Sequence, residues 1–225
     1  MGCYNTGTET DLNYRLMKLK TKVALLSRYM VKCSKIIIAE DFMNTITYKE
    51  FSRFLETNIY YDGRWEYFKI VIEMIHEIKP RNVLELGPSL FTVVHDSDIM
   101  YKPDIDSWGL PDNVNGKKYA HDATIIPWPI KDKQYDLFIA LQVFEHLYDK
   151  QSEAFEEAKR IANSIILSLP YKWDCPKDNP HYPSHHMIDE DTILQWSRGV
   201  RPQKTIYIPR TGDRISKGPR IICMW

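Results

Sequence analysis

The stretch RNVLELGPSLFTVV, residues 81–94, decides the fold. Its first half, Val83-Leu84-Glu85-Leu86, is a short apolar strand that carries one carboxylate and ends at Gly87-Pro88. Because an unpaired buried carboxylate is costly, a strand that only fills a core gains nothing from Glu85. A strand that delivers the chain to a ligand would use it. We therefore expect a ligand-binding edge directly after this strand.

Strands and helices alternate along the rest of the chain. A helix with an apolar face is expected before the strand, and Pro80 ends it. The other expected elements are a helix from Asp41 to about Thr57, a strand at 91–94, a strand at 135–141, a helix at 148–162, a strand at 164–170, a capped helix at 189–199, and a hairpin of 204–209 with 219–225. Residues 88–120 show no ten-residue helical pattern. This alternation is typical of a largely parallel α/β sheet with helices on both faces and, here, an antiparallel closing hairpin.

Length and charge limit the function classes. The chain has 225 residues, which fits one domain with a small accessory piece. We expect an N-terminal helical cap or lid at 1–60 and the main domain at 61–225. Thirty basic and thirty acidic residues give no net charge, so binding of nucleic acid through overall charge is not indicated. A small-molecule substrate fits this balance better.

The N-terminal segment 12–33 has apolar residues at alternating steps of four and three, the pattern of an amphipathic helix. Seven basic residues and no acidic one lie between Arg15 and Lys35. The simplest interpretation is a helix that packs on the domain with a solvated face. The alternatives are a homodimer seam, or a lid that attracts an anionic substrate or a membrane surface.

Cysteine spacing and hydropathy point to the cytoplasm. The four cysteines show no CxxC spacing and are interpreted as reduced thiols. No apolar run approaches the roughly 18 residues that span a bilayer. The first eleven residues lack the apolar region of a signal peptide.

Ligands of open α/β sheets bind beyond the carboxyl ends of the strands. Five segments follow or precede strands in this way and are expected to converge: Glu85 to Ser89, Asp96 with Asp98, HDATIIPWP at 121–129, LQVFEHL at 141–147, and PYKWD at 170–174.

The order of three of these motifs resembles class I S-adenosylmethionine-dependent methyltransferases. The motifs are VLELGP, HDATIIPWPIKDKQYDLFIALQVFEHL and EEAKRIANSIILSLP, within about residues 80–172. The resemblance implies a Rossmann-like, seven-stranded sheet with S-adenosylmethionine across its carboxyl edge. One departure is clear: the family's GxGxG turn keeps only its first glycine, Gly87.

The resemblance also implies roles for single residues. Glu85 would hold the cofactor's amino group, and Gly87 would let the backbone approach the cofactor. Asp98 would accept the ribose hydroxyls, while Asp122 and Ala123 would read the adenine. The remaining residues implied in the cofactor site are Leu86, Pro88, Ser89, Leu141 and Gln142.

Methyl transfer to a hydroxyl benefits from a base, and histidine suits that role at neutral pH. The candidates are His146, His181, His185 and His186. Three of them lie within six positions, but two prolines indicate a loop, and no DxH or HExxH pattern accompanies them, so we expect no metal. Tyr171 and Trp173 would line the substrate entrance, and Arg64 would suit a phosphate or a nucleotide-linked group.

We therefore expect a methyltransferase that acts on a hydroxyl of a small polar metabolite or sugar. N-methylation of a small amine is one alternative. A non-catalytic scaffold is another, favoured by the degraded glycine turn. A nicotinamide enzyme is disfavoured because GxGxxG is missing.

Overall fold

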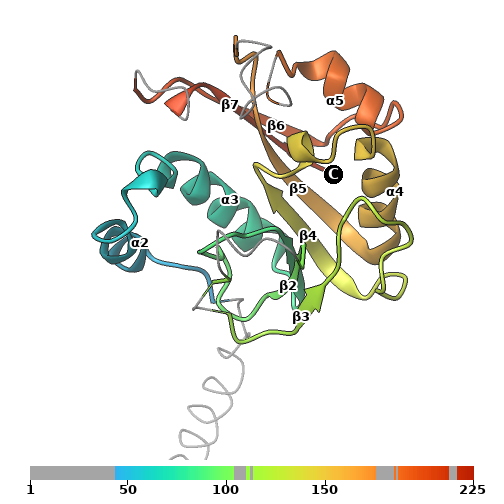
Figure 1. Ribbon diagram of the computed structural model, residues 1–225, viewed down its shortest axis with the longest axis horizontal. Helices are drawn as coiled ribbons and strands as arrows, with labels where there is room; N and C mark the ends of the chain where they lie inside the picture. Colours follow the sequence, from blue (N-terminus) through green and yellow to red (C-terminus); the bar gives the residue numbers. More distant parts are fainter. Residues whose placement is uncertain (1–43, 104–109, 112–113, 176–184, 186, 213–216) are drawn as a thin grey trace, which may run out of the picture. The chain divides into compact units, whose positions relative to one another are not determined.

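The computed structural model describes residues 44–103, 110–111, 114–175, 185, 187–212 and 217–225 (Figure 1). The helix predicted at 12–33, Asp41, His181 and His186 lie outside the described residues. The described residues belong to one compact unit, which starts at Phe42. The division predicted at residue 60, like the dimer seam, stays a prediction.

The centre of this unit is a seven-stranded sheet with the order β3-β2-β1-β4-β5-β7-β6. The strands are β1 Val83–Leu86, β2 Asp98–Tyr101, β3 Lys118–Ala120, β4 Tyr135–Leu141, β5 Ala162–Pro170, β6 Lys204–Ile208 and β7 Arg220–Met224. Strands β1 to β5 run parallel, and β7 is antiparallel to both β5 and β6. The predicted mostly parallel sheet with a closing hairpin is confirmed.

Helices cover both faces of the sheet (Figure 1). The helices are α2 Tyr48–Leu55, η1 Ile59–Tyr61, α3 Trp65–Ile78, η2 Phe144–His146, α4 Gln151–Ile161 and α5 Glu190–Trp196. Side chains of α2 and α3 share one apolar cluster with Val83 and Ile139, while α4 and α5 share the other with Leu84 and Ala140. Neighbouring residues of β1 and β4 thus enter opposite clusters, as a strand buried on both faces requires.

Local sequence explains where the helices begin and end. Thr47 and Glu50 form a capping box that starts α2, a stronger signal than the expected Asp41. Lys79 takes a left-handed conformation after α3, and Pro80 follows. The predicted cap of α5 is confirmed, because the Asp189 side chain accepts a hydrogen bond from the Thr192 amide.

The second strand differs from the prediction. Residues 91–94 form only a single bridge, from Val94 to Thr45, and β2 begins at Asp98. The third strand, β3, was not predicted. No helix is found between β1 and β3 among the described residues there, in agreement with the missing helical pattern. None of the described helices is long and apolar enough to cross a membrane.

Candidate active site at the carboxyl edge of the sheet

The turn after β1 brings three strands together at their carboxyl ends. Gly87 has a φ of +57° and its amide donates to the Met100 carbonyl of β2 at 2.8 Å. A Cβ on Gly87 would lie 3.2 Å from a methyl group of Val143, which follows β4. Both its conformation and the approach of the β4 loop therefore favour glycine at this position. Ser89, two residues on, also has a positive φ, +58°.

Glu85 is a buried anchor for the chain that follows β1. One carboxylate oxygen accepts the Val94 amide at 2.9 Å and the Ser97 hydroxyl at 3.1 Å. The other oxygen accepts the Val93 amide at 3.2 Å. Burial raises the pKa of Glu85 to about 7, although these hydrogen bonds oppose the shift. The carboxylate thus serves the fold directly, whatever it does for a ligand.

Asp98 does not follow the second strand, and that expectation is wrong. It is the first residue of β2 and lies at the amino end of the strand. Its carboxylate accepts the Lys117 amide at 2.7 Å and the Tyr135 hydroxyl at 2.6 Å. Ligands of open α/β sheets bind beyond the carboxyl ends of the strands, whereas Asp98 lies at an amino end, and its role toward a ribose stays a prediction.

Asp122 lies after β3, at the expected edge. One oxygen accepts the amide and the hydroxyl of Thr124 at 2.9 and 2.8 Å, and the other faces the Lys102 ammonium at 3.2 Å. The Thr124 amide is the main group that holds the pKa of Asp122 below its usual value. Lys102 follows β2, so this ion pair joins the carboxyl ends of β2 and β3.

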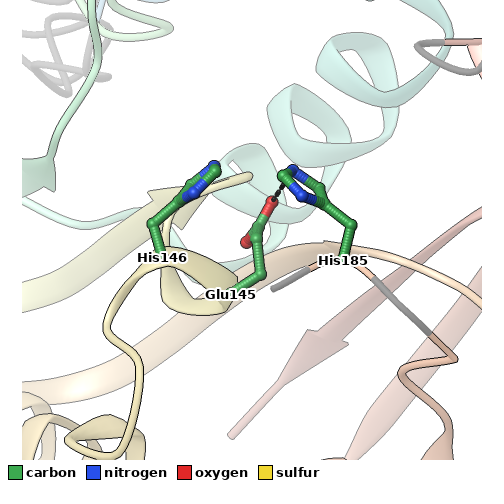
Figure 2. Close-up of side chains that lie close together, drawn as sticks. All are labelled: Glu145, His146 and His185. Atoms are coloured by element: carbon green, nitrogen blue, oxygen red, sulfur yellow. Dashed lines mark ion pairs between the residues drawn. The ribbon is translucent and has the colours of Figure 1, made fainter. Parts of the chain in front are cut away.

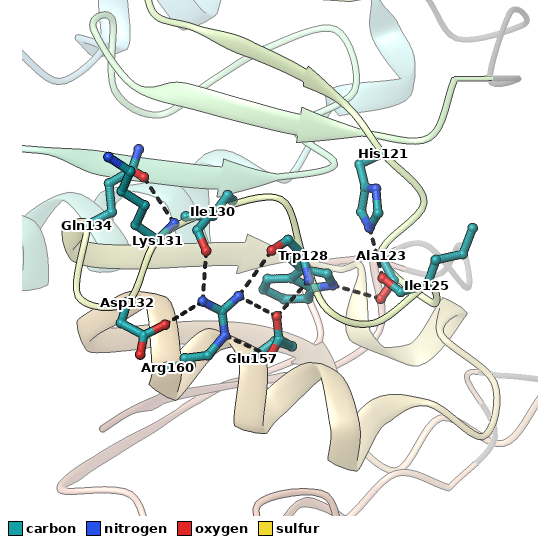
Figure 3. Close-up of polar contacts among 10 residues, drawn as sticks. All are labelled: His121, Ala123, Ile125, Trp128, Ile130, Lys131, Asp132, Gln134, Glu157 and Arg160. Carbon is teal, nitrogen blue, oxygen red and sulfur yellow. Dashed lines mark hydrogen bonds and ion pairs between the residues drawn. The ribbon is translucent and has the colours of Figure 1, made fainter.

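Arg160 of α4 holds the segment that contains Asp122 (Figure 3). Its guanidinium donates to the Ile130 carbonyl and the Asp132 carboxylate, both at 2.7 Å, and to the Trp128 carbonyl at 3.1 Å. The Trp128 indole in turn donates to the Ala123 carbonyl at 3.0 Å. The buried Trp128 side chain thereby holds the backbone of Ala123 in place.

The loop after β4 turns sharply at its predicted site residues. Leu141 ends β4, and Gln142 has a φ of +59°. The Gln142 amide donates to the Ser168 carbonyl at 2.8 Å, and its side chain donates to the Ser168 hydroxyl at 2.9 Å. These bonds direct the following residues across the end of the sheet.

A small cavity of about 10 Å³ is lined by residues that the sequence placed in two groups. Its lining includes Glu85, Leu86, Pro88 and Leu141, all predicted for the cofactor, and Arg64, predicted for the substrate. Arg64 precedes α3, and its guanidinium lies over the Tyr60 and Tyr61 rings at 4.7 and 4.5 Å. The cavity thus places a cation beside the turn after β1.

A second group lies just beyond, where the β4 and β5 loops meet (Figure 2). The Glu145 carboxylate and the His146 ring come from η2, and Nε2 of His185 lies 3.9 Å from Oε1 of Glu145. The two imidazole rings are 4.7 Å apart in an edge-to-face arrangement. Glu145 has no exposed surface, and burial raises its pKa to about 8. His146 is exposed, so the group opens to solvent on its side.

Trp173 and Tyr171 are engaged with protein neighbours. The Trp173 ring stacks on His185 at 5.7 Å, and the Arg220 guanidinium lies 5.6 Å from the same ring. The Tyr171 hydroxyl donates to Glu190 at 2.8 Å. Trp173 therefore supports His185 instead of offering an open face.

Comparison with solved structures identifies the fold. A SAM-dependent methyltransferase from Thermotoga maritima, described as a possible histamine N-methyltransferase, aligns with a TM-score of 0.52 and 12% identity, over 79% of this chain and 98% of that chain. The chain has a methyltransferase fold. The methyltransferase domain of a bacterial Hen1 protein aligns at 0.46, with 14% identity over 72% and 98% of the two chains. A SAM-dependent methyltransferase from Methanosarcina mazei aligns at 0.49, with 11% identity over 67% and 95%.

No family model matches the chain, and no curated protein matches its sequence. The methyltransferase fold therefore rests on structure, and it confirms the fold that the motif order predicted.

Glu145 was not singled out from the sequence, although it lies in the segment LQVFEHL that was expected to reach this edge. Its signal was a carboxylate beside Phe144 shortly after a buried strand, and the structure shows that this carboxylate is fully buried.

Proposed function

We propose that this protein is an S-adenosylmethionine-dependent methyltransferase. The observation that carries the proposal lies at the carboxyl edge of a methyltransferase-fold sheet, where the β1 turn contacts β2 and the β4 loop, and the β3 loop contacts the end of β2. Gly87 contacts both β2 and the β4 loop, and Asp122 is paired with the residue that follows β2. A cofactor that spans this edge would touch all of these loops.

Two ends of the cofactor have matching groups on the chain. The ionised Asp122 would accept the adenine amine, with the Ala123 backbone beside it, because charge-assisted hydrogen bonds are the stronger kind. Arg64 lines the same small cavity as Leu86 and Pro88, so its guanidinium would suit the cofactor's methionine carboxylate, while its role toward a phosphate of the acceptor stays the alternative. Pro88, Ser89, Leu141 and Gln142 would shape the walls between these ends.

Methyl transfer requires mainly that the protein align the acceptor with the methyl group of the cofactor. The sulfonium already activates the methyl group, so the protein must hold the acceptor in line with the bond that breaks, and positioning is worth up to about 7–11 kcal/mol. The acceptor is proposed to be a hydroxyl of a small polar metabolite or sugar. The group of Glu145, His146 and His185 beyond the β4 and β5 loops supports this choice, because its polar atoms lie together where an acceptor hydroxyl could be activated.

Calorimetric titration with S-adenosylhomocysteine tests the proposal. We expect one molecule bound per chain, and weaker binding by about 1–3 kcal/mol for Asp122→Ala, since the adenine amine would lose its acceptor. Asp191→Ala, an exposed carboxylate in the first turn of α5, is the matched control and is expected to bind as wild type. A folded wild-type protein that binds no S-adenosylhomocysteine would support the scaffold alternative.

A further inference from the structure

The carboxylate of Glu145 is buried without a hydrogen-bonded partner among the described residues, and the Arg220 and Arg64 guanidinium groups act on it only through their charge. It has no exposed surface, and no hydrogen-bond donor of the described residues reaches either of its oxygens. The approach of His185 at 3.9 Å is too long for a hydrogen bond. Buried carboxylates are normally paired, hydrogen-bonded or bound to a metal, because desolvation is costly.

Two imidazoles share the space around this carboxylate. One ligand atom from each of Glu145, His146 and His185 can be chosen so that all three lie within 4.8 Å of one another (Figure 2). Ligand atoms around a tetrahedral ion lie about 3.4 Å apart when each bond is about 2.1 Å. Glu145 and His185 are 3.9 Å apart, so both histidine side chains would have to move closer to the carboxylate to reach that spacing.

We propose that Glu145, His146 and His185 form a binding site for one divalent transition-metal ion. Two imidazole nitrogens with one carboxylate oxygen suit zinc, cobalt, iron or manganese better than magnesium, which prefers oxygen ligands. This departs from the expectation of no metal, which considered the histidines at 181–186 without a partner from the β4 loop.

Neighbouring structure would hold two of the ligands in place. Glu145 is fixed by η2, whose flanking residues Phe144 and Leu147 are buried. His185 stacks on Trp173, and backbone hydrogen bonds from Lys172 to Ile188 and from Met187 to Trp173 hold the chain that follows it. Such support is typical of ligands that stay oriented for a metal.

Three protein ligands leave coordination positions for water or a substrate oxygen. If the proposed methyl transfer is correct, a metal here would bind the acceptor hydroxyl and lower its pKa, because a bound cation favours the deprotonated oxygen. Only this role rests on the proposed function, whereas the metal site itself does not.

Metal titration of the chelator-treated full chain tests the site. We expect one Co²⁺ or Zn²⁺ per chain by calorimetry, visible absorption from Co²⁺ bound to nitrogen, and much weaker binding of Mg²⁺. Glu145→Gln and His185→Ala are each expected to weaken Co²⁺ binding beyond the roughly 10–100-fold loss typical of outer-shell changes. His146→Ala removes an exposed ligand and remains informative if a buried variant fails to fold.

The matched control is His95→Ala. His95 lies 3.2 Å from Glu50, a closer histidine–carboxylate pair, but no third ligand is grouped with it among the described residues. Unchanged Co²⁺ affinity is expected for this control. Wild-type protein without stoichiometric Co²⁺ binding, or ligand variants that bind as tightly as wild type, would overturn the inference. S-adenosylhomocysteine binding separates the two proposals, since its loss with Co²⁺ binding intact contradicts only the methyltransferase proposal.

Discussion

At the residue scale, a single buried carboxyl group, Glu85, organises the chain at the carboxyl edge of the sheet. Glu85 was interpreted from sequence as a ligand group, and the structure gives it three hydrogen bonds from residues 93–97. A carboxylate in an apolar strand predicted correctly that something converges there. The sequence could not tell whether the partner is a ligand or the chain's own backbone, because both offer the same kind of donor.

Replacing Glu85 with glutamine is expected to destabilise the fold by about 1–3 kcal/mol, because the amide has one acceptor oxygen where the carboxylate has two. Urea unfolding measures this free energy. Glu73→Gln, on the exposed side of α3, is expected to unfold as wild type. A Glu85→Gln variant with wild-type stability would mean that the three hydrogen bonds contribute nothing.

The Glu85→Gln variant should also change how the free energy of unfolding depends on pH. Burial raises the pKa of folded Glu85 from 4.5 to about 7, so the folded chain holds an extra proton between these values. The stabilisation that this proton gives the folded state is fully present below about pH 4.5 and is lost as the pH rises through about 7. Glu85→Gln should therefore reduce the fall in unfolding free energy across this range, by up to about 1.4 kcal/mol per pH unit.

Arg64 allows a test that separates the two ends of the cofactor. Arg64→Gln is expected to weaken S-adenosylhomocysteine binding about 10–100-fold, the value of a charged hydrogen bond of about 1.5–3 kcal/mol. Adenosine lacks the methionine carboxylate, so its affinity should not change. Equal losses for both ligands, measured by calorimetry, would show that Arg64 does not contact the carboxylate.

At the scale of elements, long apolar or strongly periodic segments and the apolar strand β1 were predictable, whereas the short strands β2 and β3 were not. β4, β5, α3, α5 and the β6–β7 hairpin all agree with the sequence. β2 and β3 have four and three residues, too few for a periodic pattern to be recognised. Asp98 was misplaced for this reason, since its position relative to the edge depends on where β2 starts.

Arg160 of α4 holds the segment between β3 and β4 through hydrogen bonds to two of its carbonyls. The positions of Asp122 and Ala123 in this segment depend on those bonds. Arg160→Leu should leave the carbonyls of Trp128 and Ile130 without this donor and reduce stability by about 1–3 kcal/mol. S-adenosylhomocysteine affinity should fall as well, because Arg160 would no longer hold the segment of Asp122 and Ala123, which is proposed to bind adenine. Thermal unfolding and calorimetry measure both effects.

Lys159→Leu is the control for this prediction. Lys159 is the neighbouring cation of α4, and it pairs only with Glu156 within its helix at 3.2 Å among the ion pairs of the described residues. Its loss should cost less than about 0.5 kcal/mol. An Arg160→Leu variant that keeps full cofactor affinity would show that the loop holds its shape without α4.

For the whole molecule, the order of the motifs carried more information than any one motif. VLELG alone is weak, but the order of the later motifs predicted a sheet whose carboxyl edge gathers the loops after β1, β3 and β4. The grouping of Glu145 with His185 could not be predicted, because forty residues separate them in sequence. The part played by residues 12–33 stays a prediction.

A crystal structure of the full chain with S-adenosylhomocysteine tests the central claim most directly. We expect adenine beside Asp122, the methionine carboxylate at Arg64, and the sulfur facing the loop that carries His146. Ligand bound elsewhere, or an empty carboxyl edge at saturating ligand, would contradict it.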